Sequence, residues 1–272
     1  MNKLTLPLFH HRQARKPPRG QSFLELALVL PILLLILLGL FEVVVFIGRY
    51  LDLLDMTREA ARFASLRDPF VTAPLNQVDC RPKVVIGGVE VEPPFHFYYA
   101  TSCIFSPPQG SGCAVESWCN GINTNAALDM TTDDVVISVF TVTNTVVTNT
   151  WPQKVMKGNP VPGVNTNDHW ALSDHDADED HNENWRKDCQ GNIERDEPYY
   201  TRERINEVMQ QSDPTYYTRT KGFVAVELYY CYRQVMGLPL LAGTFIPNPA
   251  RILVYSLMPL PAAAPTATPH AP

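Results

Sequence analysis

A long apolar run dominates the hydrophobic pattern near the start of the chain. No charged residue occurs from Leu26 to Phe41, and Phe23 to Ile47 is apolar except for Glu25 and Glu42. At 1.5 Å per residue, about 20 such residues cross a hydrocarbon layer of about 30 Å. A buried core helix fits this run less well, because no face is polar across its middle. The pattern therefore predicts a membrane-spanning helix.

The helix is expected to continue beyond the membrane, since no proline occurs between Pro31 and Pro69. Apolar residues at helical spacing alternate there with charged ones, namely Tyr50, Leu51, Leu54, Ala61 and Ala64 with Asp52, Asp55, Arg58, Arg62 and Arg67. This pattern predicts an amphipathic stalk that ends at Asp68-Pro69. Its apolar stripe needs a partner, and the protein's own β-sheet is the simplest candidate.

After Pro69 the pattern changes to short strands and turns. Runs rich in β-branched and aromatic residues predict strands at Val84–Val91, Phe95–Tyr99, Asp134–Val147, Phe223–Arg233 and Arg251–Met258, and Arg202–Gln211 predicts a short helix. The fold class expected is α+β, in which a long N-terminal transmembrane and amphipathic helix precedes a mainly antiparallel, pilin-like β-sheet domain. The expected segments are a basic leader at 1–20, the helix at 21–68, the domain at 69–260 and a disordered tail at 261–272.

The charge distribution predicts how the chain lies in the membrane. Residues 1–20 contain five basic residues and no acid, whereas the remainder has 17 basic and 28 acidic residues. The positive-inside rule places residues 1–20 in the cytoplasm and the chain after about residue 48 outside the cytoplasmic membrane. The apolar run exceeds the about 7–15 residues of a secretory signal, and no small-x-small site follows it, so an uncleaved anchor is expected. An acidic domain argues against nucleic acid as a partner.

The six cysteines all fall on the predicted outer side, at Cys80, Cys103, Cys113, Cys119, Cys189 and Cys231. An even number of cysteines outside the membrane favours disulfides, with 15 connectivities open. Metal binding is the competing interpretation, although no Cys-x-x-Cys pair occurs. Cys113 and Cys119 are close enough in sequence to close a local loop.

The segment Ser173–Asn184 concentrates acidic residues. Asp174, Asp176 and Asp178 follow the alternate spacing by which calcium loops direct carboxylates at the ion, and Asp180 continues it. A solvated acidic loop without an ion is the other interpretation, because the positions of the turn glycine and of the final bidentate acid are not matched. Three histidines, His169, His175 and His181, define no strong zinc site. Calcium is thus the one cofactor that the pattern suggests.

Motifs of catalysis do not occur in the chain. It contains no Gly-x-Ser-x-Gly elbow, no His-Glu-x-x-His, no phosphate loop and no dinucleotide fingerprint. Paired carboxylates occur only in the acidic segment, where solvent would leave their acidity ordinary. We therefore expect a protein that is not an enzyme.

Glu25 lies at the mouth of the apolar run, where a charge opposes membrane insertion less than at mid-helix. One interpretation is that Glu25 simply lies at the interface. The preceding residues offer another, because Arg19, Gly20 and Gln21 followed by Glu25 resemble the processing site of type IV-like prepilins. The resemblance implies that a prepilin peptidase cuts after Gly20, and that Glu25 then neutralises the new α-amino group of a neighbouring subunit inside a helical bundle.

A wider pattern narrows the resemblance to one family. The residues concerned are Glu25-Leu26-Ala27-Leu28-Val29-Leu30-Pro31, then Gly39, Glu42, Gly48-Arg49 and Arg58-Glu59-Ala60-Ala61-Arg62-Phe63-Ala64. Together they resemble the N-terminal signature of the TadE family of the Tad (Flp) pilus system. The resemblance implies a minor pilin or pilus-assembly protein whose partners are the membrane, other pilins and the Tad secretion machinery. The alternatives are a bitopic surface adhesin or binding module outside any filament, and a membrane-tethered hydrolase that uses the acidic segment.

Overall fold

The computed structural model describes residues 21–70, 84–86, 89–91, 96–107, 123, 126, 128–152, 168–174, 183–211, 220–237 and 247–261. The chain divides into two units, Met1–Val43 and Val44–Pro272. Helix α1 (Gln21–Ser65) begins in the first unit and ends in the second. The predicted α+β fold class is confirmed. Residues 1–20 and 262–272 lie outside the described residues, as do the leader and almost all of the tail that the sequence predicts.

In the first unit, the apolar side chains of α1 face outward all around the helix. Side chains from Phe23 to Phe41 are largely exposed, with Phe23 76% and Leu35 42% accessible. Among the described residues, α1 is one helix that is long and apolar enough to cross a membrane. An all-round apolar helix that no other described residue covers is the pattern of a membrane span, so α1 is a candidate membrane anchor.

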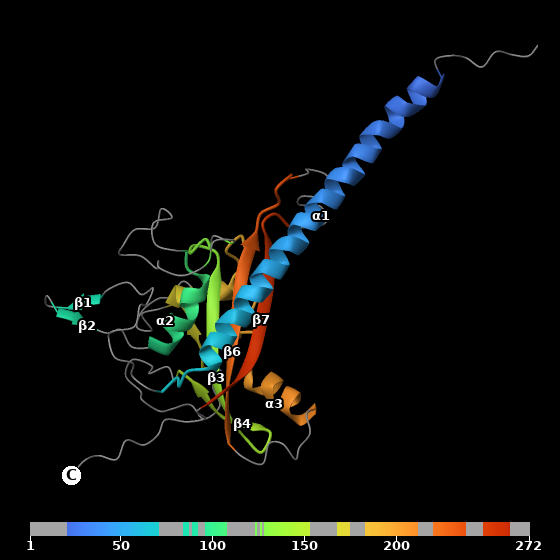
Figure 1. Cartoon of the computed structure of the whole chain (residues 1–272). Helices are drawn as coiled ribbons and strands as arrows, with labels where there is room; N and C mark the ends of the chain where they lie inside the picture. Colours follow the sequence, from blue (N-terminus) through green and yellow to red (C-terminus); the bar gives the residue numbers. More distant parts are fainter. Residues whose placement is uncertain are drawn as a thin grey trace, which may run out of the picture. The chain divides into compact units, whose positions relative to one another are not determined.

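The second unit is built on one antiparallel sheet, whose strands β3, β6 and β7 lie side by side in Figure 1. Its members are β3 (Asp134–Thr143), β4 (Val146–Trp151), β5 (Trp170–Ala171), β6 (Lys221–Tyr232) and β7 (Ala250–Leu260). The order is β4-β3-β6-β7, and β5 pairs with β3. Strands β1 (Val84–Ile86) and β2 (Val89–Val91) form a separate antiparallel pair.

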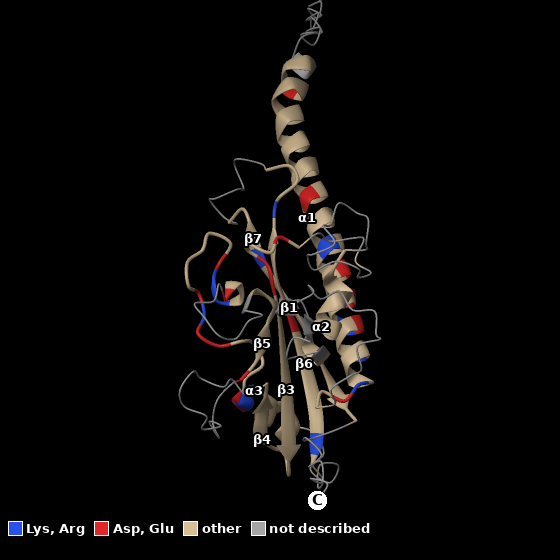
Figure 2. Ribbon diagram, turned by 90° about the vertical axis from the view of Figure 1, so that its left-hand side faces the viewer, with Lys and Arg blue, Asp and Glu red and all other residues tan. Residues whose placement is uncertain are grey.

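Both faces of the sheet are covered, which explains the nearly continuous apolar sequence of β3 and β6. One face carries Val135, Ile137, Val139, Val224, Val226, Leu228, Ile252 and Val254, packed with the second half of α1 and with α2 (His96–Ser102). The other face packs on α3 (Arg202–Gln211) and on residues 184–200, through Phe140, Val142, Phe223, Ala225, Val136 and Tyr229. Charged residues gather on α1 and the loops, while long stretches of β3 and β6 have none (Figure 2).

The half of α1 that belongs to the second unit packs through a narrow stripe. Leu53, Thr57, Ala60, Ala61 and Ala64 are each 0% exposed and recur at helical spacing. Three of these five are alanines, and small side chains allow the helix backbone to approach the strands closely. The hydroxyl of Thr57 donates to the carbonyl of Leu53 at 2.8 Å, so the buried polar group has a partner.

The stripe differs from the predicted one at its beginning. Leu51 is 51% exposed and Tyr50 is 38% exposed, although both were assigned to the buried side. Leu51 lies about 160° around the helix from Leu53 and therefore faces away from the sheet. Tyr50 precedes Leu53 by one turn, at the end of the buried stripe. The predicted stalk and its sheet partner are otherwise confirmed.

Three of the predicted strands differ from the structure. Phe95–Tyr99 was predicted as a strand, but residues 96–102 form α2, which buries Phe97, Tyr98 and Tyr99 together. The rings of Tyr98 and Tyr99 lie 6.2 and 5.1 Å from that of Trp170, so tertiary contact outweighs the β propensity of the aromatic residues.

The run Asp134–Val147 is two strands rather than one. Asn144 and Thr145 have φ of 51° and 66°, so the chain reverses there and begins β4. Positive φ at two central residues is typical of a type I′ hairpin turn, which matches the twist of the flanking strands. Val84–Val91 likewise consists of β1 and β2, and Gly87-Gly88 between them lies outside the described residues. The predictions for α3, β6 and β7 are confirmed within a few residues.

We predict that Ala61→Leu lowers the free energy of unfolding of the full-length protein by about 1–3 kcal/mol, because the added carbons have no room between α1 and the sheet. Arg62→Leu is the matched control, since Arg62 is exposed on the same turn and its replacement should change the free energy of unfolding by less than about 0.5 kcal/mol. Urea unfolding in detergent micelles measures both. Equal stability of the two variants would contradict the packing described.

Candidate functional site

The residues predicted to act in processing and subunit packing lie at the start of α1. Gly20 lies outside the described residues, and Gln21 is the first residue of the helix. Glu25 is exposed on the first turns of α1, within a helix whose neighbouring side chains are apolar. An exposed acid on an otherwise apolar helix is favourable only near the membrane interface or opposite a positive charge.

Of the cysteines, Cys189 and Cys231 form a disulfide with a Cα–Cα distance of 5.7 Å. Cys103 is also disulfide-bonded. Cys80, Cys113 and Cys119 lie outside the described residues. The disulfide interpretation is therefore correct for Cys189, Cys231 and Cys103, while the local loop proposed for Cys113 and Cys119 stays a prediction.

The predicted calcium residues fall largely outside the described part of the chain. Asp176, Asp178 and Asp180 lie outside it, and Asp174 ends the 3-10 turn η2 (Leu172–Asp174) with its side chain not described. Of the three histidines, only His169 is described, buried with its ring 4.8 Å from that of Trp185. Within the described ranges, no group of three or more His, Cys, Asp or Glu side chains could hold a metal ion.

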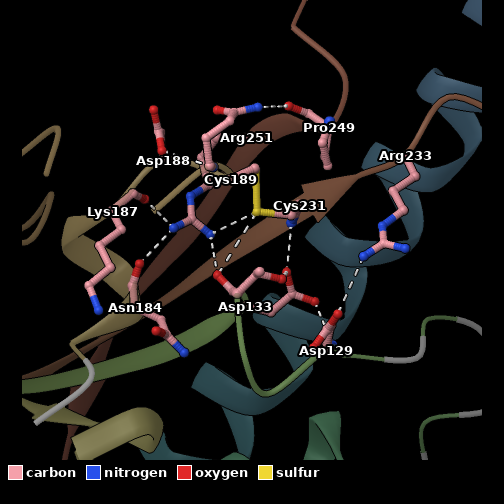
Figure 3. The surroundings of a disulfide bond; sticks show 12 residues. Asp129, Asp133, Asn184, Lys187, Asp188, Cys189, Cys231, Arg233, Pro249 and Arg251 are labelled. Atoms are coloured by element: carbon pink, nitrogen blue, oxygen red, sulfur yellow. Dashed lines mark hydrogen bonds and ion pairs between the residues drawn. A yellow bond between two sulfur atoms is a disulfide. The ribbon is translucent and has the colours of Figure 1, made fainter. Parts of the chain in front are cut away.

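A cluster of buried polar groups surrounds the Cys189–Cys231 disulfide (Figure 3). The guanidinium of Arg251 donates to the carbonyls of Thr132 (2.8 Å), Asn184 (2.6 Å) and Lys187, and to Sγ of Cys231 (3.4 Å). These acceptors come from parts of the chain that are far apart in sequence. Arg251 therefore ties β7 to the turn before β3 and to residues 184–187. Its burial lowers the pKa of its guanidinium.

Asp133 completes this cluster from the turn that precedes β3. Its carboxylate accepts from the backbone N–H of Cys231 and of Asp129, each at 2.7 Å. Burial raises the pKa of Asp133 to about 6, even though these hydrogen bonds and the charge of Arg251 act in the opposite direction. The carboxylate thereby fixes the disulfide end of β6 to the start of β3.

Asp134, the first residue of β3, is fully enclosed. Its carboxylate accepts from the hydroxyl and N–H of Ser173 (2.5 and 3.0 Å), the N–H of Trp185 (3.0 Å) and the N–H of Val135 (2.9 Å). Burial raises its pKa to about 6, and the four donors limit the rise. Asp134 thus joins Ser173, at the start of the acidic segment, and Trp185, directly after its end, to the sheet.

Glu227, in the middle of β6, likewise joins Tyr199 and Tyr200 to the sheet. Its carboxylate accepts from the N–H of Tyr199 and of Tyr200, each at 2.8 Å, and from the hydroxyl of Tyr229 at 2.5 Å. Desolvation raises the pKa of Glu227. The guanidinium of Arg195 lies 4.9 Å from the centre of the Tyr229 ring and adds a nearby positive charge. Residues 195–200 are therefore held on the sheet face by one buried acid.

Sequence reasoning missed Asp133, Asp134, Glu227 and Arg251 as a group. One signal for Glu227 was present, because it occupies an apolar position in the alternation of Phe223, Ala225 and Glu227. A carboxylate on a buried strand face requires donors. What these four residues do chemically is structural, since their acceptors and donors are mostly backbone groups of this chain. The candidate functional site is thus α1 itself, and the buried carboxylates shape the domain behind it.

Comparison with known proteins agrees with the pattern in α1. Residues 20–62 match the family described as TadE-like protein. The match covers Gln21, Glu25 and the buried stripe up to Ala61, and it confirms the resemblance seen in the sequence. No curated protein and no solved structure matches the chain.

Removing the disulfide is predicted to destabilise the domain. The two cysteines are 42 residues apart, so replacing both, in Cys189→Ser with Cys231→Ser, should lower the free energy of unfolding by about 2–4 kcal/mol. The measurement is urea unfolding of the full-length chain in detergent under oxidising conditions. Under reducing conditions the double variant should behave as the wild type does. A double variant as stable as the oxidised wild type would refute this role.

The buried acids predict an unusual dependence of stability on pH. The folded protein holds the proton of Asp134 more strongly than the unfolded chain, so the stabilisation is complete below about pH 4 and is lost as the pH rises through about 6. The free energy of unfolding should fall over this interval, by up to about 3 kcal/mol for Asp134 alone. Asp133 and Glu227 act in the same direction.

The matched variant is Asp134→Asn, which removes one titrating group and should flatten the fall between pH 4 and pH 7. Asp129 and Asp188 have lowered pKa values, so their stabilisation is lost only as the pH falls below about 4. Urea unfolding at a series of pH values tests both statements. Stability that increases from pH 4 to pH 7 in the wild type would show that the hydrogen bonds outweigh burial.

Proposed function

We propose that this chain, TadE-like over residues 20–62, is a minor pilin or pilus-assembly protein of a Tad-type pilus system. The observation that carries the proposal is that the TadE-like segment coincides with α1, both its exposed apolar half and the half that packs on the sheet. In this proposal α1 anchors the chain in the cytoplasmic membrane, with the N-terminus inside and the domain outside. The protein acts by assembly rather than by catalysis.

Glu25 supplies the physical reason for assembly. A carboxylate on an apolar helix is costly to bury alone, and the cost is offset when a positive charge lies opposite it. Cleavage after Gly20 would turn Gln21 into an N-terminal cation four residues before Glu25. A neighbouring helix in a bundle could then place its cation against Glu25, so that each subunit neutralises the next. The partners are accordingly other pilins, the prepilin peptidase and the Tad secretion machinery.

The exposed side of α1 supports the same role. Between Asp52 and Arg62, its outward residues are charged, and Arg58 lies 3.6 Å from Asp55. Exposed pairs of this kind contribute less than about 1 kcal/mol to stability, so they are free to exchange partners with a neighbouring subunit. The apolar half provides lateral packing in the membrane, and the charged half remains in water.

The proposal predicts that the mature chain begins at Gln21, which intact-mass analysis of the membrane protein will measure. It also predicts that Glu25→Gln reduces the amount of this chain in sheared pili at least about tenfold, while the amount in the membrane is unchanged. Glu59→Gln is the matched control, since Glu59 is an exposed acid on the same helix and should assemble normally.

An uncut chain that is absent from pili in every variant would instead favour a bitopic adhesin or binding module outside the filament. If the mature chain begins at Gln21 and the Glu25→Gln variant assembles as well as the wild type, the pilin assignment stands. The charge-pairing role of Glu25 is then refuted.

A further inference from the structure

The two edges of the main sheet differ in whether side chains are bonded to their outward backbone groups. At the β4 edge, helix α3 supplies side chains to the strand backbone: Asn206 accepts from the N–H of Val147 at 2.7 Å, and Arg202 donates to the carbonyl of Val147 at 2.7 Å. These contacts occupy the outward backbone groups of Val147, the second residue of that short strand. An edge closed by side chains cannot accept another strand.

The β7 edge has no such cover among the described residues. In β6 the N–H of Cys231 points toward β3, because it donates to Asp133. Successive backbone groups alternate in direction, so the even-numbered residues of β6 bond to β7. Their register partners, such as Val254 and Ser256, are also even-numbered. The odd-numbered residues of β7 therefore direct their N–H and C=O groups outward.

The outward residues are Leu253, Tyr255 and Leu257, followed by Pro259, whose missing N–H is tolerated on an edge. Within the described part of the chain, no hydrogen bond reaches the backbone of the first three. Strand β7 is 11 residues long and has no charged residue after Arg251. Proteins usually protect an exposed edge with charge, a bulge or a short strand. Along β7, only Arg251 near its start and Pro259 near its end offer such protection.

Exposed aromatic side chains accompany the open edge. Tyr255 is 39% exposed and its ring stacks on that of Tyr199 at 3.9 Å, with the two hydroxyls 2.8 Å apart. Hydrogen-bonding groups and apolar surface are therefore offered together, as in sheets that accept an added strand.

We propose that β7 pairs with β7 of a second copy of this chain. Residues 252–260 of β7 carry no charge, so two copies meet there with no like charges opposed, and the outward N–H and C=O groups of each can pair with those of the other. Anchoring by α1 holds both copies in one membrane and raises their effective concentration. Because α3 closes the β4 edge, strand addition stops at two copies. The proposal goes beyond the pilus function and does not require it, since the pairing itself rests on β7, and α1 contributes only the membrane anchor.

The first test uses photo-crosslinking in membranes from cells that express two differently tagged full-length copies. A benzophenone amino acid at Tyr255 should join the two tags, and the same residue at Val146 should not. Val146 is the matched position, 48% exposed on the closed β4 edge. Equal crosslinking at the two positions, or crosslinks from Tyr255 only to a different protein, would overturn the proposal.

The second test changes the edge itself. Tyr255→Lys places a charge on both strands of the pair and should lower self-association in detergent at least about tenfold, as measured by sedimentation velocity. Val146→Lys adds the same charge to the closed edge and should leave the dimer intact. Tyr255→Phe removes the hydroxyl bonded to Tyr199 but keeps the ring, and should also remain dimeric. A wild type that stays monomeric, assembles beyond two copies or is unaffected by Tyr255→Lys would refute the pairing.

Discussion

The contact between the second half of α1 and one face of the sheet is the constraint on which the domain depends. Leu53, Ala60, Ala61 and Ala64 bury completely there, and the same face receives α2 and the apolar residues of three strands. Apolar burial at about 25 cal/mol per Å² is the main favourable contribution to such a core. The buried stripe and the apolar run belong to one helix, α1.

The other face of the sheet is organised by a different interaction. Residues 184–200 have little regular structure besides the turn η3 (Asn184–Arg186) and one isolated bridge, so their backbone groups need partners elsewhere. Asp134 and Glu227 provide them from the sheet, and Arg251 accommodates the carbonyls. Burying these charges costs free energy, yet each accepts or donates several hydrogen bonds that hold the segment in one conformation. The two faces thus combine apolar packing with charge-anchored loops.

Periodicity predicted several of the elements along the chain, but not the contacts between its distant parts. The apolar run, helix α3 and strands β6 and β7 follow from local pattern. Helix α2 does not follow from local pattern, because its aromatic residues favour strands. Their packing on Trp170 stabilises the helix instead. Six cysteines allow 15 connectivities, and nothing local in the sequence distinguishes those that pair Cys189 with Cys231. No sequence pattern indicated the role of Arg251, because the carbonyl groups that it binds come together only in the folded protein.

The family match covers most of α1 and none of the sheet. A match confined to the membrane run could arise from apolar composition, but residues 20–62 also include the amphipathic half that packs on the sheet. What the chain shares with TadE-like proteins is therefore the sequence of α1, in both its apolar and its amphipathic half. The match ends before the sheet, the disulfide and the buried acids begin. The likeness to TadE-like proteins therefore concerns α1, whereas the properties of the domain, including its β7 edge, depend on residues outside the match.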